Sequence, residues 1–230
     1  MKSDIYRINN AVEKVRNGKN TQFLDGKEFK LASQKLKGCE YKVYYPHKSC
    51  EKVILYTGKV PEVTLFKIYT VDKIRHQDIL GSLFALNIDS SCFGDIILFD
   101  NNYYVFIIKE MADYIKNNLK IIGNCTINLE EVSLNTLDNY ERMYEEHEII
   151  ISSLRIDNVI SGIINSSRSK TLEKIKNKEV IVNYEVMNKS SYIIKENDIF
   201  SIKRFGKYKY VGKINETKKN NYVIKFLKYI

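Results

Sequence analysis

The sequence predicts an α+β protein made of several small domains. Of its 230 residues, 44% are hydrophobic, which is enough to form more than one buried core. Helix-like and strand-like patterns alternate along the chain, and shifts in composition separate them. We expect four segments: N-terminal helices (1–50), a mixed α/β domain (51–133), an acidic connector (134–150) and a small α+β domain ending in a hairpin (151–230).

The first segment shows the spacing of two amphipathic helices. In "SDIYRINNAVEKVRNG" the apolar residues recur on one side of a helix that stops at Gly18. In "DGKEFKLASQKLKG" the apolar stripe consists of Phe29, Ala32 and Leu36, and the pattern stops at Gly38. The stretch "YKVYYP" that follows is extended in character.

The second segment alternates strands and helices in a recognisable order. From Val63 onward the predicted elements run β-α-β-β-α-β, at 63–70, 76–86, 95–99, 103–109, 110–119 and 125–132. Asp100-Asn101-Asn102 predicts a hairpin turn between the second and third strands. This order is typical of the ferredoxin-like plait. Many RNA-binding domains share it, as do many domains that never contact RNA. Tyr104 and Phe106 could stack on bases, but we favour an ordinary core strand.

The last segment begins with two short helices. The first is capped by Ser152 or Ser153, with apolar residues at positions i, i+3, i+4 and i+7 from Ile156, and the second runs from Arg168 to about Asn177. Strands follow at "EVIVN" and "DIFSI". A hairpin formed by "KYKYVGKI" and "NYVIKFLKYI" ends the chain.

Charge is distributed unevenly along the chain. The net charge of +9 divides into +8 for residues 1–75, −9 for 76–149 and +10 for 150–230. A general compositional bias toward lysine would act on the whole chain, so this segregation indicates distinct basic and acidic surfaces. The C-terminal block is the best candidate for contact with phosphate.

Lys170, Lys174 and Lys178 lie four residues apart, which on a helix makes one stripe of like charge. Each such pair costs about 0.2–0.5 kcal/mol unless an anion faces it. The simplest alternative is an ordinary solvated face of lysines.

The order of these motifs resembles the S-four domain, the RNA-binding module named for small-subunit ribosomal protein four. The matching residues are Arg155 and Asp157 in "LRID", Ser167 to Lys170 in "SSRSK", Val180, Val182 and Asn183 in "VIVN", and Asp198 in "NDIFSI". The usual Asn-Gly turn is Asn183-Tyr184 here. The resemblance implies that the lysine stripe faces an RNA backbone.

The physical chemistry of these residues agrees with that implication. The start of the second helix offers free N–H groups and a positive dipole end to a phosphate, and arginine and lysine side chains contact the backbone. In "KRFGKYKYVG", Lys207 and Lys209 alternate with tyrosines that we expect in the core. The predicted RNA-binding residues are Arg155, Ser167, Arg168, Ser169, Lys170, Lys174, Lys178, Asn183, Arg204, Lys207 and Lys209. This interpretation requires Arg155, Arg168 and Lys174 to point the same way and to be free of carboxylates.

The wider chain resembles the YlmH-like proteins of bacteria, through "QFLDGKE", "RHQDILGSLFALNI", "FGDIIL" and "KRFGKYKYVG". The resemblance implies a non-enzymatic RNA-binding protein, encoded near cell-division genes. It also implies binding to ribosomal RNA and tRNA on the large ribosomal subunit, in rescue of stalled subunits. Gln77 replaces an arginine of the family pattern. Gly58-Lys59-Val60 replaces the family's glycine-glycine-tyrosine turn, and Thr64-Leu65 replaces its acidic-arginine pair. These departures weigh against nucleic-acid contact by the acidic middle domain.

We expect no catalytic residues, no cofactor and no metal site. The sequence has no G-x-G-x-x-G motif after a strand, and its three histidines and four cysteines lack ligand spacing. Two alternatives stay open. The first is an RNA-modifying enzyme such as a pseudouridine synthase relative, because "LRID" looks like the catalytic Arg-x-Asp motif of those enzymes. The second is a division-linked adaptor whose acidic middle domain binds a protein partner. Because neither a signal peptide nor a membrane span is apparent, we expect a protein of the cytoplasm. We also expect a monomer.

Overall fold

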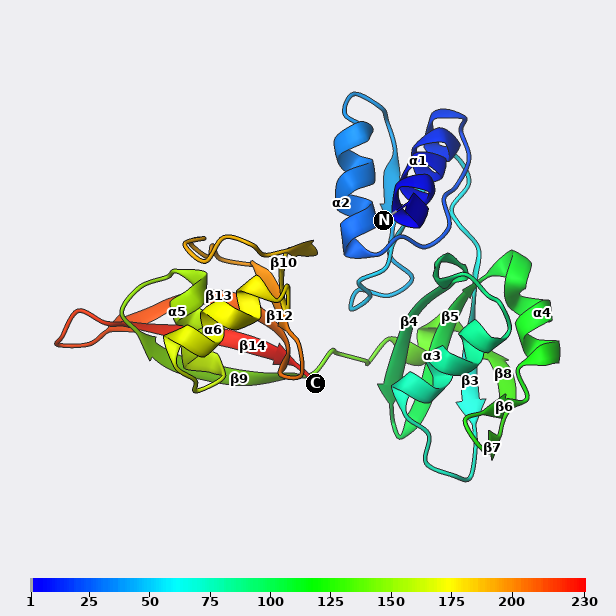
Figure 1. Cartoon of the computed structure of the whole chain (residues 1–230). Coiled ribbons are helices and arrows are strands. Elements are labelled where there is room, and N and C mark those ends of the chain that lie inside the picture. Colours follow the sequence, from blue (N-terminus) through cyan, green and yellow to red (C-terminus); the bar gives the residue numbers. More distant parts are fainter. Residues whose placement is uncertain (1) are drawn as a thin grey trace. The chain divides into compact units, whose positions relative to one another are not determined.

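The computed structural model describes the backbone of residues 2–230 and the side chains from Ile5 onward (Figure 1). The chain is a mixed α+β protein with several antiparallel sheets. It divides into two compact units, Met1–Glu141 and Arg142–Ile230. No helix in the described part of the chain has the length and apolar character needed to cross a membrane.

Two helices open the first unit, α1 (Lys2–Arg16) and α2 (Gly26–Lys35), and both sequence predictions are confirmed. The predicted apolar stripes are buried against each other and against the strand β2 (Ile54–Tyr56), which pairs with β1 (Lys42–Tyr44). Asp25 caps α2 and forms a capping box with Glu28, which satisfies free N–H groups of the first turn.

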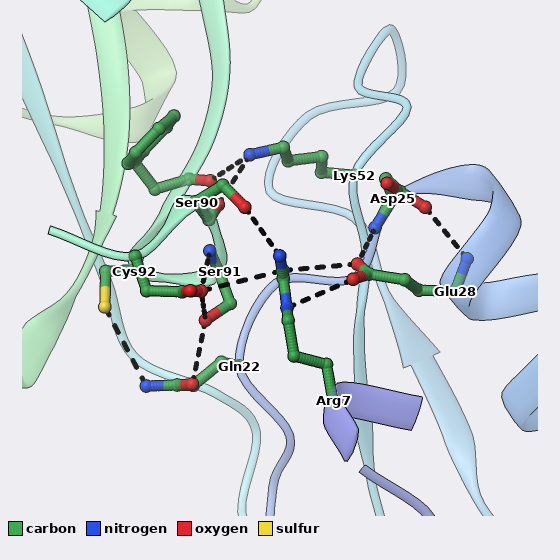
Figure 2. Close-up of polar contacts among 10 residues, drawn as sticks. Arg7, Gln22, Asp25, Glu28, Lys52, Ser90, Ser91 and Cys92 are labelled. Atoms are coloured by element: carbon green, nitrogen blue, oxygen red, sulfur yellow. Dashed lines mark hydrogen bonds and ion pairs between the residues drawn. The ribbon is translucent and has the colours of Figure 1, made fainter. Parts of the chain in front are cut away.

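A buried polar network attaches these helices to the rest of the unit (Figure 2). The guanidinium of Arg7 pairs with Glu28 (3.1 Å) and Asp89 (3.7 Å) and donates to Ser90 Oγ (2.7 Å). Lys52 Nζ donates to the carbonyl oxygens of Ser90 and Phe93, each at 2.7 Å. Desolvation lowers the pKa of this lysine to about 8. The network therefore joins α1, α2 and the turn η1 (Ser90–Cys92).

A four-stranded antiparallel sheet follows, in the order β4-β5-β3-β8. Its strands are β3 (Val63–Tyr69), β4 (Phe93–Phe99), β5 (Asn102–Ile108) and β8 (Asn128–Val132). The helices α3 (His76–Ala85) and α4 (Lys109–Asn118), a small hairpin of β6 (Ile121–Ile122) and β7 (Cys125–Thr126), and the turn η2 (Leu134–Leu137) complete the unit. Asp100 and Asn101 have φ values of 48° and 59°, as the predicted hairpin turn requires.

The aromatic residues of β5 belong to the core of this unit. Tyr104 is 3% exposed and Phe106 is fully buried. Their side chains cannot reach an RNA base, so the core interpretation is confirmed and the stacking interpretation of this strand is wrong.

The second unit is a six-stranded antiparallel sheet in the order β11-β10-β12-β13-β14-β9. Its strands are β9 (Tyr144–Ile151), β10 (Val180–Val182), β11 (Glu185–Val186), β12 (Ile199–Ile202), β13 (Gly206–Glu216) and β14 (Tyr222–Tyr229). The helices α5 (Ile156–Ile163) and α6 (Arg168–Lys176) lie on one face of this sheet (Figure 1). They bury Val159, Ile160 and Ile175 against the inward residues of the strands.

Two expectations for this part of the chain need correction. Residues 144–150 were expected in a connector, but they belong to β9, which pairs with β14 along its length. The stretch is acidic because an edge strand carries exposed charges, and Glu145 and Glu146 pair across the strands with Lys228 (3.1 Å) and Lys225 (2.7 Å). The helix expected from Ser152 or Ser153 begins only at Ile156, because both serines instead accept hydrogen bonds from the side chain of Asn158.

Candidate nucleic-acid interface

The candidate interface is built around one buried carboxylate, that of Asp157 in the first turn of α5. Its side chain is fully buried. Arg155 donates to it from Nε (3.1 Å) and Nη2 (2.9 Å), and Arg168 donates from the same two atoms at the same distances. The backbone N–H of Asn158 adds a further bond of 2.9 Å. The carboxylate thus connects α5 to the start of α6 and holds two guanidinium groups together.

The cluster keeps a positive charge. Burial alone would raise the pKa of Asp157, but the hydrogen bonds from Arg155 and Arg168 outweigh that effect, and the pKa lies below its ordinary value. Asp157 is therefore ionised at neutral pH, and two cations share one anion. A guanidinium has five N–H donors, of which each arginine uses two here. The side chain of Arg168 is 61% exposed and that of Arg155 is 36% exposed, so unused donors face solvent.

The expectation that the main cations are free of carboxylates is wrong, so the RNA-binding interpretation fails in the form that required three free cations. Arg155 and Arg168 share Asp157, and Lys174 pairs with Glu179 at 2.9 Å. The side chain of Lys174 is only 23% exposed and lies over the ring of Phe205, at 5.3 Å from its centroid. Sequence spacing missed this pair because Glu179 lies beyond the end of α6, where the chain turns back.

The start of α6 agrees with the sequence prediction. The helix begins at Arg168 and Ser167 is its N-cap, with Oγ accepting from the backbone N–H of Lys170 at 3.5 Å. Ser169 Oγ lies 3.0 Å from Ser167 Oγ. The side chains of all four residues from Ser167 to Lys170 are exposed at this helix end.

The lysine stripe is shorter than predicted. The helix ends at Lys176, and Lys178 lies past the C-cap Asn177 with a φ of 60°. Only Lys170 and Lys174 therefore occupy one helical face. Lys178 is exposed on the loop that leads into β10.

Asn183 has a structural role in the fold. Its side chain donates to Asp198 (2.8 Å) and accepts from the backbone N–H of Ile199 (3.0 Å). Asp198 is buried and also accepts from the hydroxyl of Tyr192 at 2.8 Å. Desolvation and this bond raise the pKa of Tyr192 to about 12. Asn183 and Tyr184 both have positive φ, 48° and 68°, so the turn keeps the left-handed geometry expected of Asn-Gly with a tyrosine in the glycine position.

The strand β13 separates charge from apolar surface as predicted. Tyr208 and Tyr210 are 5% and 3% exposed and belong to the core, whereas Lys207 and Lys209 lie on the opposite face. Lys207 Nζ lies 5.5 Å from the ring centroid of Tyr184 and 4.6 Å from that of Tyr229. Arg204 is exposed in the turn between β12 and β13. The structure thus distributes the predicted residues over two places, the α5–α6 corner and the β12–β13 turn.

Sequence reasoning did not select Lys203 and Phe205, which lie in that same turn and are exposed. Their position in the turn, beside the predicted Arg204, was the available signal. Among the described residues, no group of three or more His, Cys, Asp or Glu side chains could hold a metal ion.

Comparisons with known proteins point to one group. Residues 62–136 match the family described as "Putative RNA-binding domain in YlmH". The chain is 28% identical over 219 residues to the "Ribosome-associated protein quality control protein P2" of Bacillus subtilis, a match covering 90% of this chain and 85% of that protein. A solved structure titled "Cell division protein ylmH from Streptococcus pneumoniae" superposes with a TM-score of 0.48 at 20% identity, over 59% of this chain and 92% of that one.

The family match covers the middle of the chain and makes that part similar to a domain described as RNA-binding. Over most of its length the chain is similar to the Bacillus subtilis relative, and the protein that it resembles is therefore YlmH-like, with an RNA-binding domain.

Proposed function

We propose that this protein is a non-enzymatic RNA-binding protein that contacts ribosomal RNA, tRNA or both on the large ribosomal subunit during ribosome-associated quality control. The name of the Bacillus subtilis relative, which matches over most of both chains, supports the assignment to the ribosome. We further propose that the protein acts as a cytoplasmic monomer.

The observation that carries the proposal is the pair of arginines fixed by Asp157. The shared carboxylate orients Arg155 and Arg168 beside the N-terminal end of α6, where a positive dipole end and the exposed Ser167 and Lys170 also lie. Prepositioned guanidinium groups bind phosphate oxygens with a small loss of side-chain entropy. We assign the α5–α6 corner to RNA backbone contacts.

We also propose the finer fold assignments. The strand order β4-β5-β3-β8, with α3 and α4 between its strands, supports a ferredoxin-like plait over residues 51–133. The two helices and the strands that follow them support an S-four-type domain, and it includes β9 in addition to the predicted 151–230.

The geometry argues against the pseudouridine synthase alternative. A catalytic aspartate must reach its substrate, but the side chain of Asp157 is fully buried and five hydrogen bonds occupy its two oxygens. Its role is to hold the two arginines.

Co-sedimentation with purified large ribosomal subunits tests the proposal. The double variant Arg168→Ala with Lys170→Ala removes exposed cations at the α5–α6 corner. It should bind the subunits more weakly, and its affinity should depend less on salt concentration. Each lost phosphate contact changes the slope of log K against log salt by about 0.9 on duplex RNA.

A matched control removes two positive charges elsewhere in the same unit. Lys218→Ala with Lys219→Ala alters the exposed loop between β13 and β14, which holds none of the predicted RNA-binding residues. This control should bind as wild type does. Equal binding by the Arg168/Lys170 variant and the wild type would refute the assignment of the surface, and a missing RNA modification in cells without the protein would refute the non-enzymatic role.

A further inference from the structure

A groove in the second unit lies apart from the arginine cluster. It has a volume of about 540 Å³ and lies at one end of β10 and β12. Lys178 and Glu179 line it from the loop after α6, and Lys203, Arg204 and Gly206 line it from the β12–β13 turn. A hydrogen bond of 3.0 Å from the Lys203 N–H to the Glu179 carbonyl holds these two segments together.

The groove opens on the sheet face opposite α5 and α6. In β10, Val180 and Val182 point into the core, at 0% and 3% exposure, whereas Ile181 between them is 39% exposed. The strand register places Ile181 opposite Val186 on one side and Ser201 on the other, and Ser201 opposite Lys207. One row of side chains across four strands thus changes from the apolar Val186 and Ile181 to the polar Ser201 and then to the cationic Lys207.

The rim of the groove is strongly basic. Lys178, Lys203 and Arg204 are all exposed, and Lys207 lies at the cationic end of the row. Among the lining residues, the carboxylate belongs to Glu179, which already pairs with Lys174. The positive charge of Lys203 and of Arg204 lowers the pKa of Glu179 further, after the larger effect of its bond to Lys174.

Two of the cationic residues at the rim have a left-handed backbone conformation. Lys178 has a φ of 60° and Arg204 a φ of 72°. Lys178 adopts this conformation as the residue after the C-cap of α6, and Arg204 adopts it in the turn between β12 and β13. Both residues line the groove, Lys178 from the loop after α6 and Arg204 from the β12–β13 turn.

The geometry points to a second RNA subsite, one that holds an unpaired nucleotide of a single-stranded segment. The base packs on Ile181, and the flanking phosphates contact Lys178, Lys203 and Arg204. An apolar floor with a basic rim fits a nucleotide because each nucleotide combines a flat, weakly polar base with an anionic phosphate. This inference rests on the proposed RNA-binding function and adds the class of RNA that the groove selects.

The test measures binding of the full chain to two probes, a short single-stranded oligouridylate and a short RNA duplex, by fluorescence anisotropy. Ile181→Ser and Arg204→Ala should each weaken oligouridylate binding about tenfold, because the first removes an apolar contact with the base and the second a charged contact with a phosphate. Neither variant should change duplex binding by more than about twofold, because the α5–α6 corner is intact.

Ile214→Ser is the matched control for Ile181→Ser. It replaces an exposed isoleucine of the same sheet, 50% exposed, about 26 Å along β13 from the turn. It should bind both probes as wild type does, and equal melting temperatures of the two variants exclude a folding defect.

The outcomes separate the two proposals. If the Ile181→Ser protein binds oligouridylate as tightly as wild type, or if a short polyglutamate peptide competes equally well for the groove, the subsite is overturned while duplex binding still supports the RNA function. If the wild-type protein binds neither probe nor the large ribosomal subunit, the proposed function itself fails.

Discussion

Lys178 allows a sharp test of the groove, because replacing it with glycine should raise stability through the backbone and lower RNA affinity through the lost side chain. The residue follows the C-cap of α6, and its N–H bonds to the Ile175 carbonyl (3.0 Å) while the Glu179 N–H bonds to the Lys174 carbonyl (2.9 Å). This is the Schellman pattern of a helix end, in which glycine usually occupies the left-handed position. Lys178 holds that position at a φ of 60°.

Lys178→Gly should therefore stabilise the protein and weaken its binding to RNA. A side chain in the left-handed region costs about 1–2 kcal/mol, and the added freedom of glycine in the unfolded chain offsets about 0.4–1 kcal/mol. The free energy of unfolding should rise by about 0.5–1 kcal/mol. For a unit the size of the second one, the melting temperature should rise by about 3–6 °C.

Two variants separate the backbone from the charge. Lys178→Ala removes the charge but keeps the left-handed backbone, so it should leave the melting temperature unchanged and weaken oligouridylate binding. Lys176→Gly removes the same charge from the last residue of α6, where glycine is unfavourable by about 0.5–1 kcal/mol, and should lower the melting temperature.

Calorimetry of the full chain and anisotropy with oligouridylate measure both effects. A Lys178→Gly protein that melts no higher than wild type would refute the strain argument. Wild-type oligouridylate affinity in the Lys178→Ala protein would refute the assignment of a phosphate contact to this lysine.

Three further perturbations test other parts of the structure. Arg7→Ala leaves the buried Glu28 without its cation and should cost about 3 kcal/mol in urea unfolding, with RNA affinity unchanged. Asp157→Asn should cost about 1.5–3 kcal/mol, because it weakens charged hydrogen bonds but leaves two arginines that solvent can still reach. The folded pKa of Asp157 is lowered, so the carboxylate stabilises the fold fully above the unfolded pKa of about 3.9. This stabilisation is lost as the pH falls through the folded pKa. The melting temperature of the variant should therefore depend less on pH below about pH 4. Tyr184→Gly should raise the melting temperature by a few degrees, about 2–5 °C, because it relieves a φ of 68°.

Periodicity predicted most of the elements because it records which face of a segment is buried. The stripes of α1 and α2, the alternation in β13 and the turn at Asp100-Asn101 all express local geometry, and the structure shows each of them. The strand β9 escaped prediction because its exposed acidic residues hid the alternation of His147, Ile149 and Ile151 on the inward face.

Ion pairs escaped prediction for a different reason. Arg7 meets Asp89 across more than eighty residues, and Lys174 meets Glu179 only because the chain reverses after α6. Spacing rules on one helix cannot anticipate partners supplied by the tertiary fold. The same limit explains why an uninterrupted lysine stripe was expected where α6 in fact ends.

The pairing of Arg155 and Arg168 with Asp157 changes how the proposed RNA surface works. Two free arginines would each lose rotamer freedom on meeting a phosphate, whereas these two are already fixed by hydrogen bonds of 2.9–3.1 Å to a fully buried anion. The anion lowers the net charge of the cluster by one, so long-range attraction of RNA is weaker than the sequence alone suggests. In exchange, the remaining N–H donors of both guanidinium groups keep fixed directions. The cluster should therefore contribute more to the geometry of binding than to its salt dependence, and the salt dependence should come mainly from the unpaired lysine Lys170 and from the basic rim of the groove.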